Sequence, residues 1–233
     1  IGSDGGIALR DALKTSNLKF LAIGKMYTSK GGAVITGSQL TTGVTLSAGG
    51  RLGELISGPD SDFDVKLRWT DDRKESDRMR LHSLDGEPLK LPLQSPFEGE
   101  HLDLAHQQLD PGHIVILAWW LTTEFSGALT SVVLDENELT GTKIKDKGTP
   151  IEKIEELDAD LSGFTEFCSS LKSSTIVSLS LRKCYLGPQA LDLLADAIKF
   201  KAAVDAVAIG GNPITSAGGA TLLETIKTSK LKT

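Results

Sequence analysis

One arrangement of apolar and polar residues occurs four times between residues 102 and 214. Apolar residues alternate with polar ones around a central Leu or Ile, and a further apolar residue follows five positions later. Alternation over so short a stretch predicts a half-buried β-strand that ends in a turn. The four predicted strands lie around residues 102–104, 132–134, 179–181 and 207–209.

The segments between these strands carry apolar residues at helical spacing. Asp110 followed by Pro111 is typical of a helix start, because Asp accepts hydrogen bonds from free backbone N–H groups. Pro188 opens a later helix, and a last helix is predicted over residues 218–226. The apolar positions of the first three helices are Ile114, Leu117, Ala118 and Leu121; Phe164, Phe167, Cys168 and Leu171; and Leu191, Leu194, Ala197 and Ile198.

The two ends of the chain repeat each other. Residues 1–20 and 214–233 are identical at ten of twenty aligned positions. In the first copy, Ser3 or Asp4 is expected to cap a short helix, and residues 18–23 to form a strand. Strand and helix therefore alternate at roughly 28 residues, which predicts a solenoid of βα units.

The motif LxLxx(N/C)xL with a following helix resembles the leucine-rich repeat of the ribonuclease-inhibitor type. Cys184 occupies the position that Asn137 and Asn212 hold in neighbouring units. The resemblance implies that this side chain is buried and satisfies backbone groups of the turn, and Cys168 is expected in the core. The chain departs from the motif at Met26 and Gln107, which stand at the same position.

The interval of 47 residues between the second and third strands is irregular. Residues 140–153 show no helix-like apolar face. Leu157 divides the interval if it marks a degenerate strand, and we include that strand in the prediction.

Residues 24–100 interrupt the repeat. Short strand-like runs alternate with Gly- and Asp-rich turns without helical spacing, which favours a small β-barrel. The order of these runs resembles small barrels of the Src-homology/Tudor kind. The runs are residues 43–46, 51–56, 63–69 and 79–84.

The predicted fold is therefore α/β: a short leucine-rich-repeat solenoid with a small all-β barrel inserted. The expected domains are a first repeat at 1–23, the barrel with its linkers at 24–100, and the rest of the solenoid at 101–233.

Composition narrows the class of function. Hydrophobic residues make up 39% of the 233 residues and charged residues 24%, with a net charge of −6. This charge argues against general nucleic-acid binding, and no apolar run reaches the roughly 18 residues of a membrane span. Two cysteines are too few for a disulfide framework. We expect an intracellular protein of the cytoplasm or an organelle interior.

No recognisable set of catalytic or metal-binding residues is found in the sequence. Phosphate loops, nucleophile elbows and paired Cys motifs are absent, and His101, His106 and His113 lack metal-ligand spacing. The segment from Asp60 to Asp64 imitates a calcium loop but has Val65 where the sharp turn needs Gly. We therefore expect a non-enzymatic chain without cofactor or metal.

The expected interaction surface is the sheet face of the solenoid. Side chains that flank the central Leu point away from the helices. They form either a solvated surface or an acidic docking face with a basic edge for a basic partner. The face comprises Asp103, Ala105, Val133, Asp135, Glu156, Asp158, Ser180, Arg182, Ala208 and Gly210, with Glu136 and Lys183 beside it.

Three tryptophans are further candidates for partner contacts. Trp119 and Trp120 are adjacent on a predicted helix, so one faces the core and the other can reach a partner. Trp69 and Phe63 are the aromatic residues available for a ligand site in the barrel, fewer than the roughly three or four that such sites normally use. A structural insertion or a protein contact is therefore favoured over ligand binding.

The predicted function is a non-enzymatic protein-interaction scaffold, as an accessory subunit of a larger assembly. Two alternatives remain open: a regulatory adaptor whose barrel binds a peptide, and an inhibitor that blocks an enzyme through its acidic face.

Overall fold

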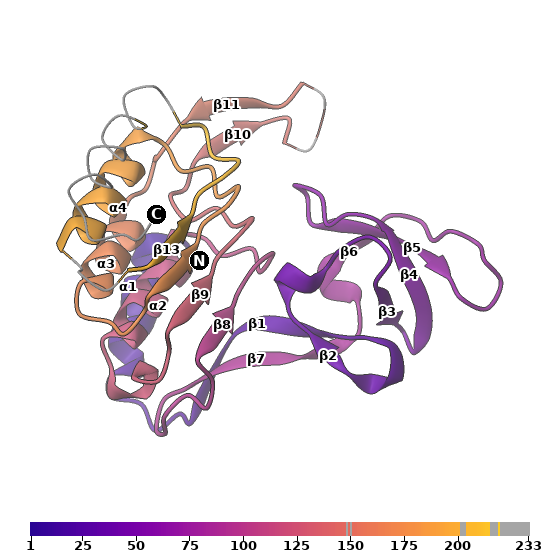
Figure 1. Ribbon diagram of the computed structural model, residues 1–233, viewed down its shortest axis with the longest axis horizontal. Coiled ribbons are helices and arrows are strands. Elements are labelled where there is room, and N and C mark those ends of the chain that lie inside the picture. Colours follow the sequence, from indigo (N-terminus) through magenta and orange to yellow (C-terminus); the bar gives the residue numbers. More distant parts are fainter. Residues whose placement is uncertain (148, 150, 201–203, 215–218, 220–233) are drawn as a thin grey trace.

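The computed structural model describes residues 1–147, 149, 151–200, 204–214 and 219. The fold is α/β, with a parallel sheet covered by helices on one side and an antiparallel unit on the other (Figure 1). The helices are α1 (Gly2–Leu13), α2 (Pro111–Leu121), α3 (Ser162–Leu171) and α4 (Pro188–Phe200), with the 3₁₀ turns η1 (Lys30–Gly32), η2 (Gly37–Gln39), η3 (Leu81–Ser83) and η4 (Glu124–Ser126). The strands are β1 (Phe20–Thr28), β2 (Val34–Ile35), β3 (Thr45–Ala48), β4 (Arg51–Ser57), β5 (Asp64–Trp69), β6 (Met79–Arg80), β7 (Gly86–Pro92), β8 (His101–Asp103), β9 (Ser131–Val133), β10 (Lys143–Lys145), β11 (Lys153–Glu156), β12 (Ser178–Ser180) and β13 (Ala206–Ala208).

The four strands predicted from the repeated motif form one parallel sheet. Its strand order is β13-β12-β9-β8, and neighbouring strands pair in register through Leu102, Val132, Leu179 and Val207. Because each strand is only three residues long, the sheet is held as much by the helices behind it as by its own hydrogen bonds.

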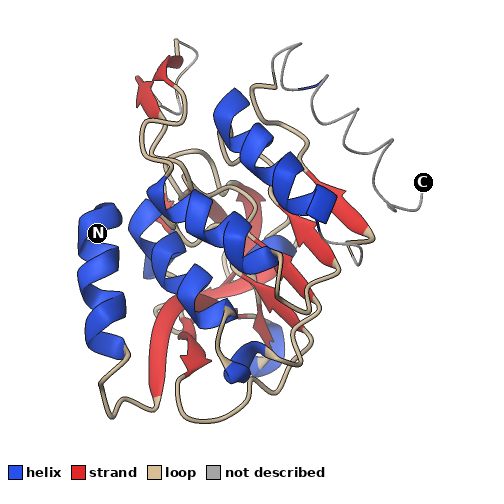
Figure 2. Ribbon diagram, turned by 90° about the vertical axis from the view of Figure 1, so that its left-hand side faces the viewer, coloured by secondary structure: helices blue, strands red, loops and turns tan. Residues whose placement is uncertain are grey.

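Helices α1 to α4 lie side by side on one face of the sheet (Figure 2). Helix α2 lies between α1 and α3, and this position explains why it is apolar on nearly all sides. Glycines allow the close approach: a Cβ at Gly6 would lie 2.3 Å from the carbonyl oxygen of Gly112. The three predicted helices at 111–121, 162–171 and 188–200 are confirmed, whereas 218 and 220–226 lie outside the described residues.

The first helix begins earlier than the sequence predicts. Its N-cap is Ile1, without a side-chain cap, so the expected cap by Ser3 or Asp4 is wrong. Ser3 instead donates a hydrogen bond from its hydroxyl to Asp160, 2.7 Å away. The helix is anchored by this contact with the segment before α3.

The strand that follows α1 does not join the parallel sheet. Strand β1 is nine residues long and pairs antiparallel with β7 along most of its length, and with β2 at its end. This pairing forms many more backbone hydrogen bonds than a three-residue parallel pair can provide. The predicted strand over 18–23 therefore continues past the expected boundary at residue 23, up to Thr28.

Strands β3 to β6 form an antiparallel sheet that curls into a half-barrel. Each of the four predicted runs of this segment overlaps one of these strands, while β2 and β7 are not among the predicted runs. The sheet encloses its own core, made of Tyr27, Leu40, Leu46, Leu55, Val65, Leu67, Leu81 and Leu84. We refer to residues 20–92 as the antiparallel unit and to the parallel sheet with its helices as the α/β unit.

The irregular interval contains a hairpin rather than another parallel strand. Strand β11 pairs antiparallel with β10, and β9 pairs directly with β12. The prediction that Leu157 marks a further strand of the parallel sheet is therefore wrong. Because β9 and β12 are hydrogen-bonded to each other, no further strand lies between them.

In the described part of the chain, no helix is both long and apolar enough to cross a membrane.

Candidate interaction site

The turns after the parallel strands are held from inside by buried side chains. Asn137 donates through Nδ2 to the carbonyls of Leu104 and Leu134, 2.8 Å each, and its Oδ1 accepts from the backbone N–H groups of Gln107 and Leu109. Since one side chain links two consecutive turns, it fixes how the turns stack.

Asn212 and Cys184 act at equivalent turns. Asn212 donates to the carbonyls of Leu181 and Ile209, both at 2.7 Å. The Cys184 thiol lies 3.2 Å from the carbonyl oxygen of Leu134, and burial raises its pKa to about 12. The predicted buried positions of Cys184 and Cys168 are confirmed, and both thiols are free.

In each turn, the second residue after the central apolar residue of the strand motif has a left-handed backbone conformation. The φ angles are 57° at His106, 59° at Glu136, 51° at Lys183 and 77° at Gly211. A non-glycine residue in this conformation carries a cost of about 1 kcal/mol, which the stacked turns must offset. His106, Glu136 and Lys183 therefore occupy equivalent positions of consecutive turns, and we call their side chains the turn row.

Charged side chains of this row contact each other. Lys183 Nζ lies 2.9 Å from a carboxylate oxygen of Glu136, and His106 Nδ1 lies 3.6 Å from the other oxygen. Within the described part of the chain, Nδ1 of His106 is buried without a hydrogen-bond partner. Burial lowers the pKa of His106, against the opposing effect of the Glu136 charge.

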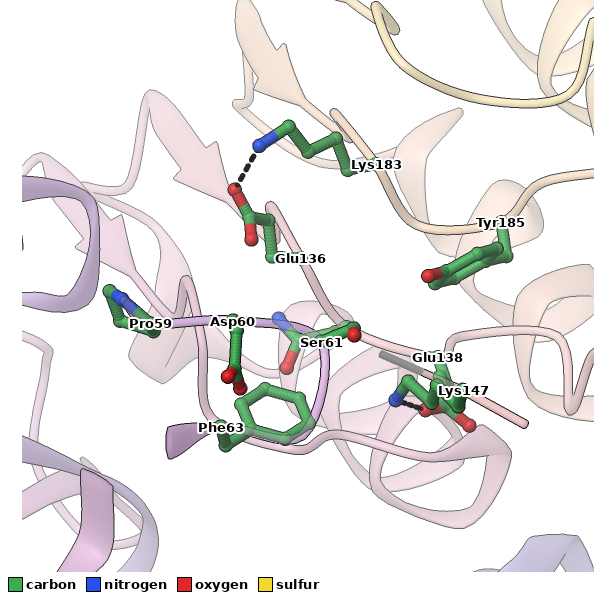
Figure 3. A pocket seen from close by; sticks show the side chains of 10 residues that line it. Pro59, Asp60, Ser61, Phe63, Glu136, Glu138, Lys147, Lys183 and Tyr185 are labelled. Atoms are coloured by element: carbon green, nitrogen blue, oxygen red, sulfur yellow. Dashed lines mark hydrogen bonds and ion pairs between the residues drawn. The ribbon is translucent and has the colours of Figure 1, made fainter. Parts of the chain in front are cut away.

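A cavity of about 210 Å³ lies between this row and the antiparallel unit. Figure 3 shows the loop before β5 facing the turns that follow β9 and β12. We call this cavity the strand-end cleft. It is lined by Pro59, Asp60, Ser61, Phe63, Glu136, Asn137, Glu138, Lys147, Lys183 and Tyr185.

One end of the cleft is an aromatic and acidic cradle that holds a lysine of the chain itself. The Lys147 ammonium lies 5.1 Å from the centroid of the Phe63 ring and forms an ion pair with Glu138 (Figure 3). Lys147 follows β10, whereas Phe63 belongs to the antiparallel unit. The cradle thus exists only where the two units and the hairpin meet.

Tyr185 borders the same cavity as a neutral phenol. Its hydroxyl donates to a carboxylate oxygen of Glu152 at 3.2 Å. Burial, together with the Glu152 charge and hydrogen bond, raises the pKa of Tyr185 to about 12. The ring therefore stays uncharged across the physiological range.

Two carboxylates of the predicted acidic face are used inside the structure. Asp103 is buried, and its carboxylate accepts hydrogen bonds from the hydroxyls of Thr36 and Ser38 in the antiparallel unit. Asp158 is also buried and accepts from the backbone N–H groups of Gly187 and Ala190 at the start of α4. Their assignment to an exposed docking face is wrong, because both satisfy donors that would otherwise be buried unpaired.

The other charged residues of that face do not form one continuous patch. Glu156 lies on β11, outside the parallel sheet, and pairs with Lys143. Asp135 accepts a hydrogen bond from the backbone N–H of Arg182 at 2.8 Å, and the Arg182 side chain is exposed. Glu136 and Lys183 are the predicted charged residues that line the cleft.

The tryptophans take different positions. Trp120 is fully buried and donates to the Pro92 carbonyl at 2.8 Å, so it is the member of the adjacent pair that faces the core and it does not contact a partner. Trp119 is half-buried and lines a groove between α1, α2 and α3, as expected for one of two adjacent residues. The Arg51 guanidinium covers the Trp69 ring, with its carbon 4.3 Å from the ring centroid.

The acidic loop that connects β4 and β5 is a turn stabilised by its own hydrogen bonds. Asp60 accepts from the backbone N–H groups of Asp62 and Asp64 and pairs with Arg78. In the described residues, no group of three or more His, Cys, Asp or Glu side chains is placed to hold a metal ion.

Among the charged and aromatic residues of the cleft, sequence reasoning did not consider Glu138, Lys147 and Tyr185 as site residues. These residues follow a turn or a strand of the hairpin, and none of them belongs to a recognisable sequence motif for binding. They come together because the hairpin and the 59–63 loop fold over the turn row, a contact between segments about eighty residues apart in sequence.

No model of a known protein family matches the chain, and no curated protein matches it in sequence.

Proposed function

We propose that this chain is a non-enzymatic protein-interaction scaffold, an accessory subunit whose α/β unit is a short leucine-rich-repeat solenoid of the ribonuclease-inhibitor-like type. The support for the solenoid is local geometry. Successive parallel strands are neighbours in chain order apart from the hairpin excursion, and Asn137, Cys184 and Asn212 bond equivalent turns.

The observation that carries the proposal is the strand-end cleft. Two separately built units meet there, and left-handed turns present Glu136, Lys183 and Tyr185 toward a common cavity. Clefts between units are places where proteins commonly bind other molecules. A rigid row of charges at fixed spacing favours recognition of an extended segment from a partner.

The adaptor alternative, in which Trp69 binds a peptide, has less support. Arg51 already covers the ring, and Trp69 packs partly into the core of the half-barrel. A ligand at this position would first have to displace a guanidinium that is also paired with Asp71.

Retention of partner proteins tests the proposal. The full chain is immobilised and incubated with an extract of its source cells, alongside Glu136→Arg in the cleft and Asp192→Arg on the exposed side of α4. Both substitutions change the net charge equally. We expect the wild type and Asp192→Arg to retain the same proteins, and Glu136→Arg to retain about tenfold less, because it reverses a charge in the proposed contact.

Circular dichroism and the unfolding midpoint show whether Glu136→Arg remains folded. If folded Glu136→Arg retains every protein as well as the wild type does, the cleft is not the interaction site. If the wild type retains nothing beyond a blank resin, the scaffold function itself is refuted.

A further inference from the structure

We propose that the strand-end cleft binds a lysine or arginine side chain of a partner protein, and that Lys147 occupies this position as an internal competitor until the partner arrives. This inference rests on the proposed scaffold function and specifies the chemistry of its partner: a protein segment with an exposed basic residue.

The cradle around Lys147 has the features of a site for an organic cation. The ammonium group lies over the Phe63 ring, 5.1 Å from the centroid, and the Glu138 carboxylate pairs with it from the side. An aromatic face combined with a carboxylate attracts ammonium and guanidinium groups by cation–π and charge-assisted contacts. Lys147 is largely buried in this arrangement, with 21% of its side chain exposed.

The surrounding charges favour a basic ligand over an acidic one. Glu136 is paired with Lys183, and Asp60 is paired with Arg78, so these carboxylates are already compensated. When Lys147 leaves, Glu138 loses the ion pair it has in this structure. The vacated cradle then carries an uncompensated negative charge beside an aromatic ring.

Lys147 lies after β10, and β10 and β11 form the smallest sheet of the described structure. Strands β10 and β11 are three and four residues long and, in the described part of the chain, pair only with each other. A two-stranded sheet this short opens at lower free-energy cost than the larger sheets do. Lys147 can therefore leave the cradle without disturbing Phe63 or Glu138, which belong to the two main units.

Exchange of one cation for another leaves the local interactions nearly unchanged. The net free energy of partner binding then comes from the partner's other contacts in the cleft. Competition from Lys147 lowers the occupancy of the cradle by weakly binding ligands. If Lys147 occupies the cradle about nine-tenths of the time, the apparent affinity for a competing cation is reduced about tenfold.

The test measures binding of a fluorescein-labelled tetralysine peptide to the full chain by fluorescence anisotropy at low salt. Lys147→Gln empties the cradle, and Lys145→Gln removes the same charge from an exposed position of the same hairpin outside the cleft. General attraction of a cationic peptide to this acidic chain is thereby equal in both variants. We expect Lys147→Gln to bind at least about threefold more tightly than Lys145→Gln.

A second substitution locates the gain. Adding Glu138→Gln to Lys147→Gln removes the carboxylate at nearly constant volume, and we expect the tighter binding to disappear. The Glu138→Gln/Lys145→Gln pair provides the matched background for this comparison. Unfolding midpoints of all variants verify that each is folded.

Equal affinity of Lys147→Gln and Lys145→Gln for tetralysine overturns the inference, as does a gain that survives Glu138→Gln. Either result leaves the scaffold proposal standing if Glu136→Arg still lowers partner retention about tenfold. Conversely, unchanged partner retention by Glu136→Arg refutes the scaffold proposal whatever tetralysine does, so the two failures are distinguishable.

Discussion

At the scale of single residues, the turns of the α/β unit depend on a few side chains that replace backbone partners. Asn137 is nearly fully buried, and its side chain forms five hydrogen bonds with two successive turns. Cys184 occupies the equivalent place with a weaker donor and no acceptor amide. One turn further along, the Asn212 Oδ1 repeats the role of the Asn137 Oδ1 by accepting from the N–H groups of Cys184 and Leu186.

We expect Asn137→Ala to lower the free energy of unfolding by about 3 kcal/mol, because buried N–H and C=O groups lose their partners at once. Urea denaturation followed by circular dichroism measures the change. Asn17→Ala, at an exposed position, is the matched control and should change stability by less than about 0.5 kcal/mol. A loss below 1 kcal/mol for Asn137→Ala would mean that water replaces the amide, contrary to this account.

At the scale of elements, one carboxylate holds together the half-barrel's first hairpin. Asp85 accepts hydrogen bonds from the Ser47 hydroxyl at 2.6 Å and from the backbone N–H groups of Gly49 and Gly50 at the β3–β4 turn. These bonds, the Ser47 hydroxyl first, lower the pKa of Asp85 from its ordinary value of 3.8. Gly49 and Gly50 have positive φ, so the turn itself requires glycine.

Because its pKa is lowered in the folded state, Asp85 makes the free energy of unfolding depend on pH in the acidic range. A carboxylate whose pKa is lower in the folded state stabilises the protein above its unfolded pKa, and this stabilisation is lost as the pH falls through the lower folded value. We expect Asp85→Asn to be less stable than the wild type above about pH 5, and the difference to shrink below about pH 4. Denaturation midpoints between pH 2 and 6 provide the measurement; a difference independent of pH would exclude this linkage.

At the scale of the whole molecule, hydrogen bonds at strand β8 hold the antiparallel unit and the α/β unit together. We call these contacts the lock between the units. The buried Asp103 accepts hydrogen bonds from Thr36 and Ser38, and Gly37 approaches so closely that an added Cβ would lie 1.8 Å from the Ala105 carbonyl oxygen. Gln107 adds contacts to β1, since its side chain bonds both the N–H and the carbonyl of Lys25. The shape of the cleft depends on this lock.

We expect Asp103→Asn to weaken the lock, because an amide replaces the charged acceptor of several hydrogen bonds, each worth about 1.5–3 kcal/mol. Hydrogen exchange of the backbone around Thr36 to Gln39 should accelerate, while exchange within β3 to β5 stays close to that of the wild type. Asp77→Asn, an exposed position in the antiparallel unit, serves as control. Unchanged exchange around η2 would show that shape alone holds the units in place.

The sequence by itself determined the local elements of this protein. Three helices and the four strands of the parallel sheet follow from short-range apolar spacing, since burial of one face demands that spacing whatever surrounds it. The buried roles of Asn137, Cys184 and Asn212 follow as well, because their positions repeat with the strands. The strands of the half-barrel were likewise visible from alternation and turn residues.

Tertiary structure alone decided the partners of β1, the hairpin β10–β11 and the site. Antiparallel pairing of β1 with β7 joins residues about sixty to seventy positions apart, and no local pattern encodes that choice. The same is true of charge: a carboxylate looks alike in sequence whether it faces solvent, as Glu156 does, or buried donors, as Asp103 does. The cleft between Phe63, Glu138 and Lys147 arises from long-range packing, which is why its chemistry became visible only in three dimensions.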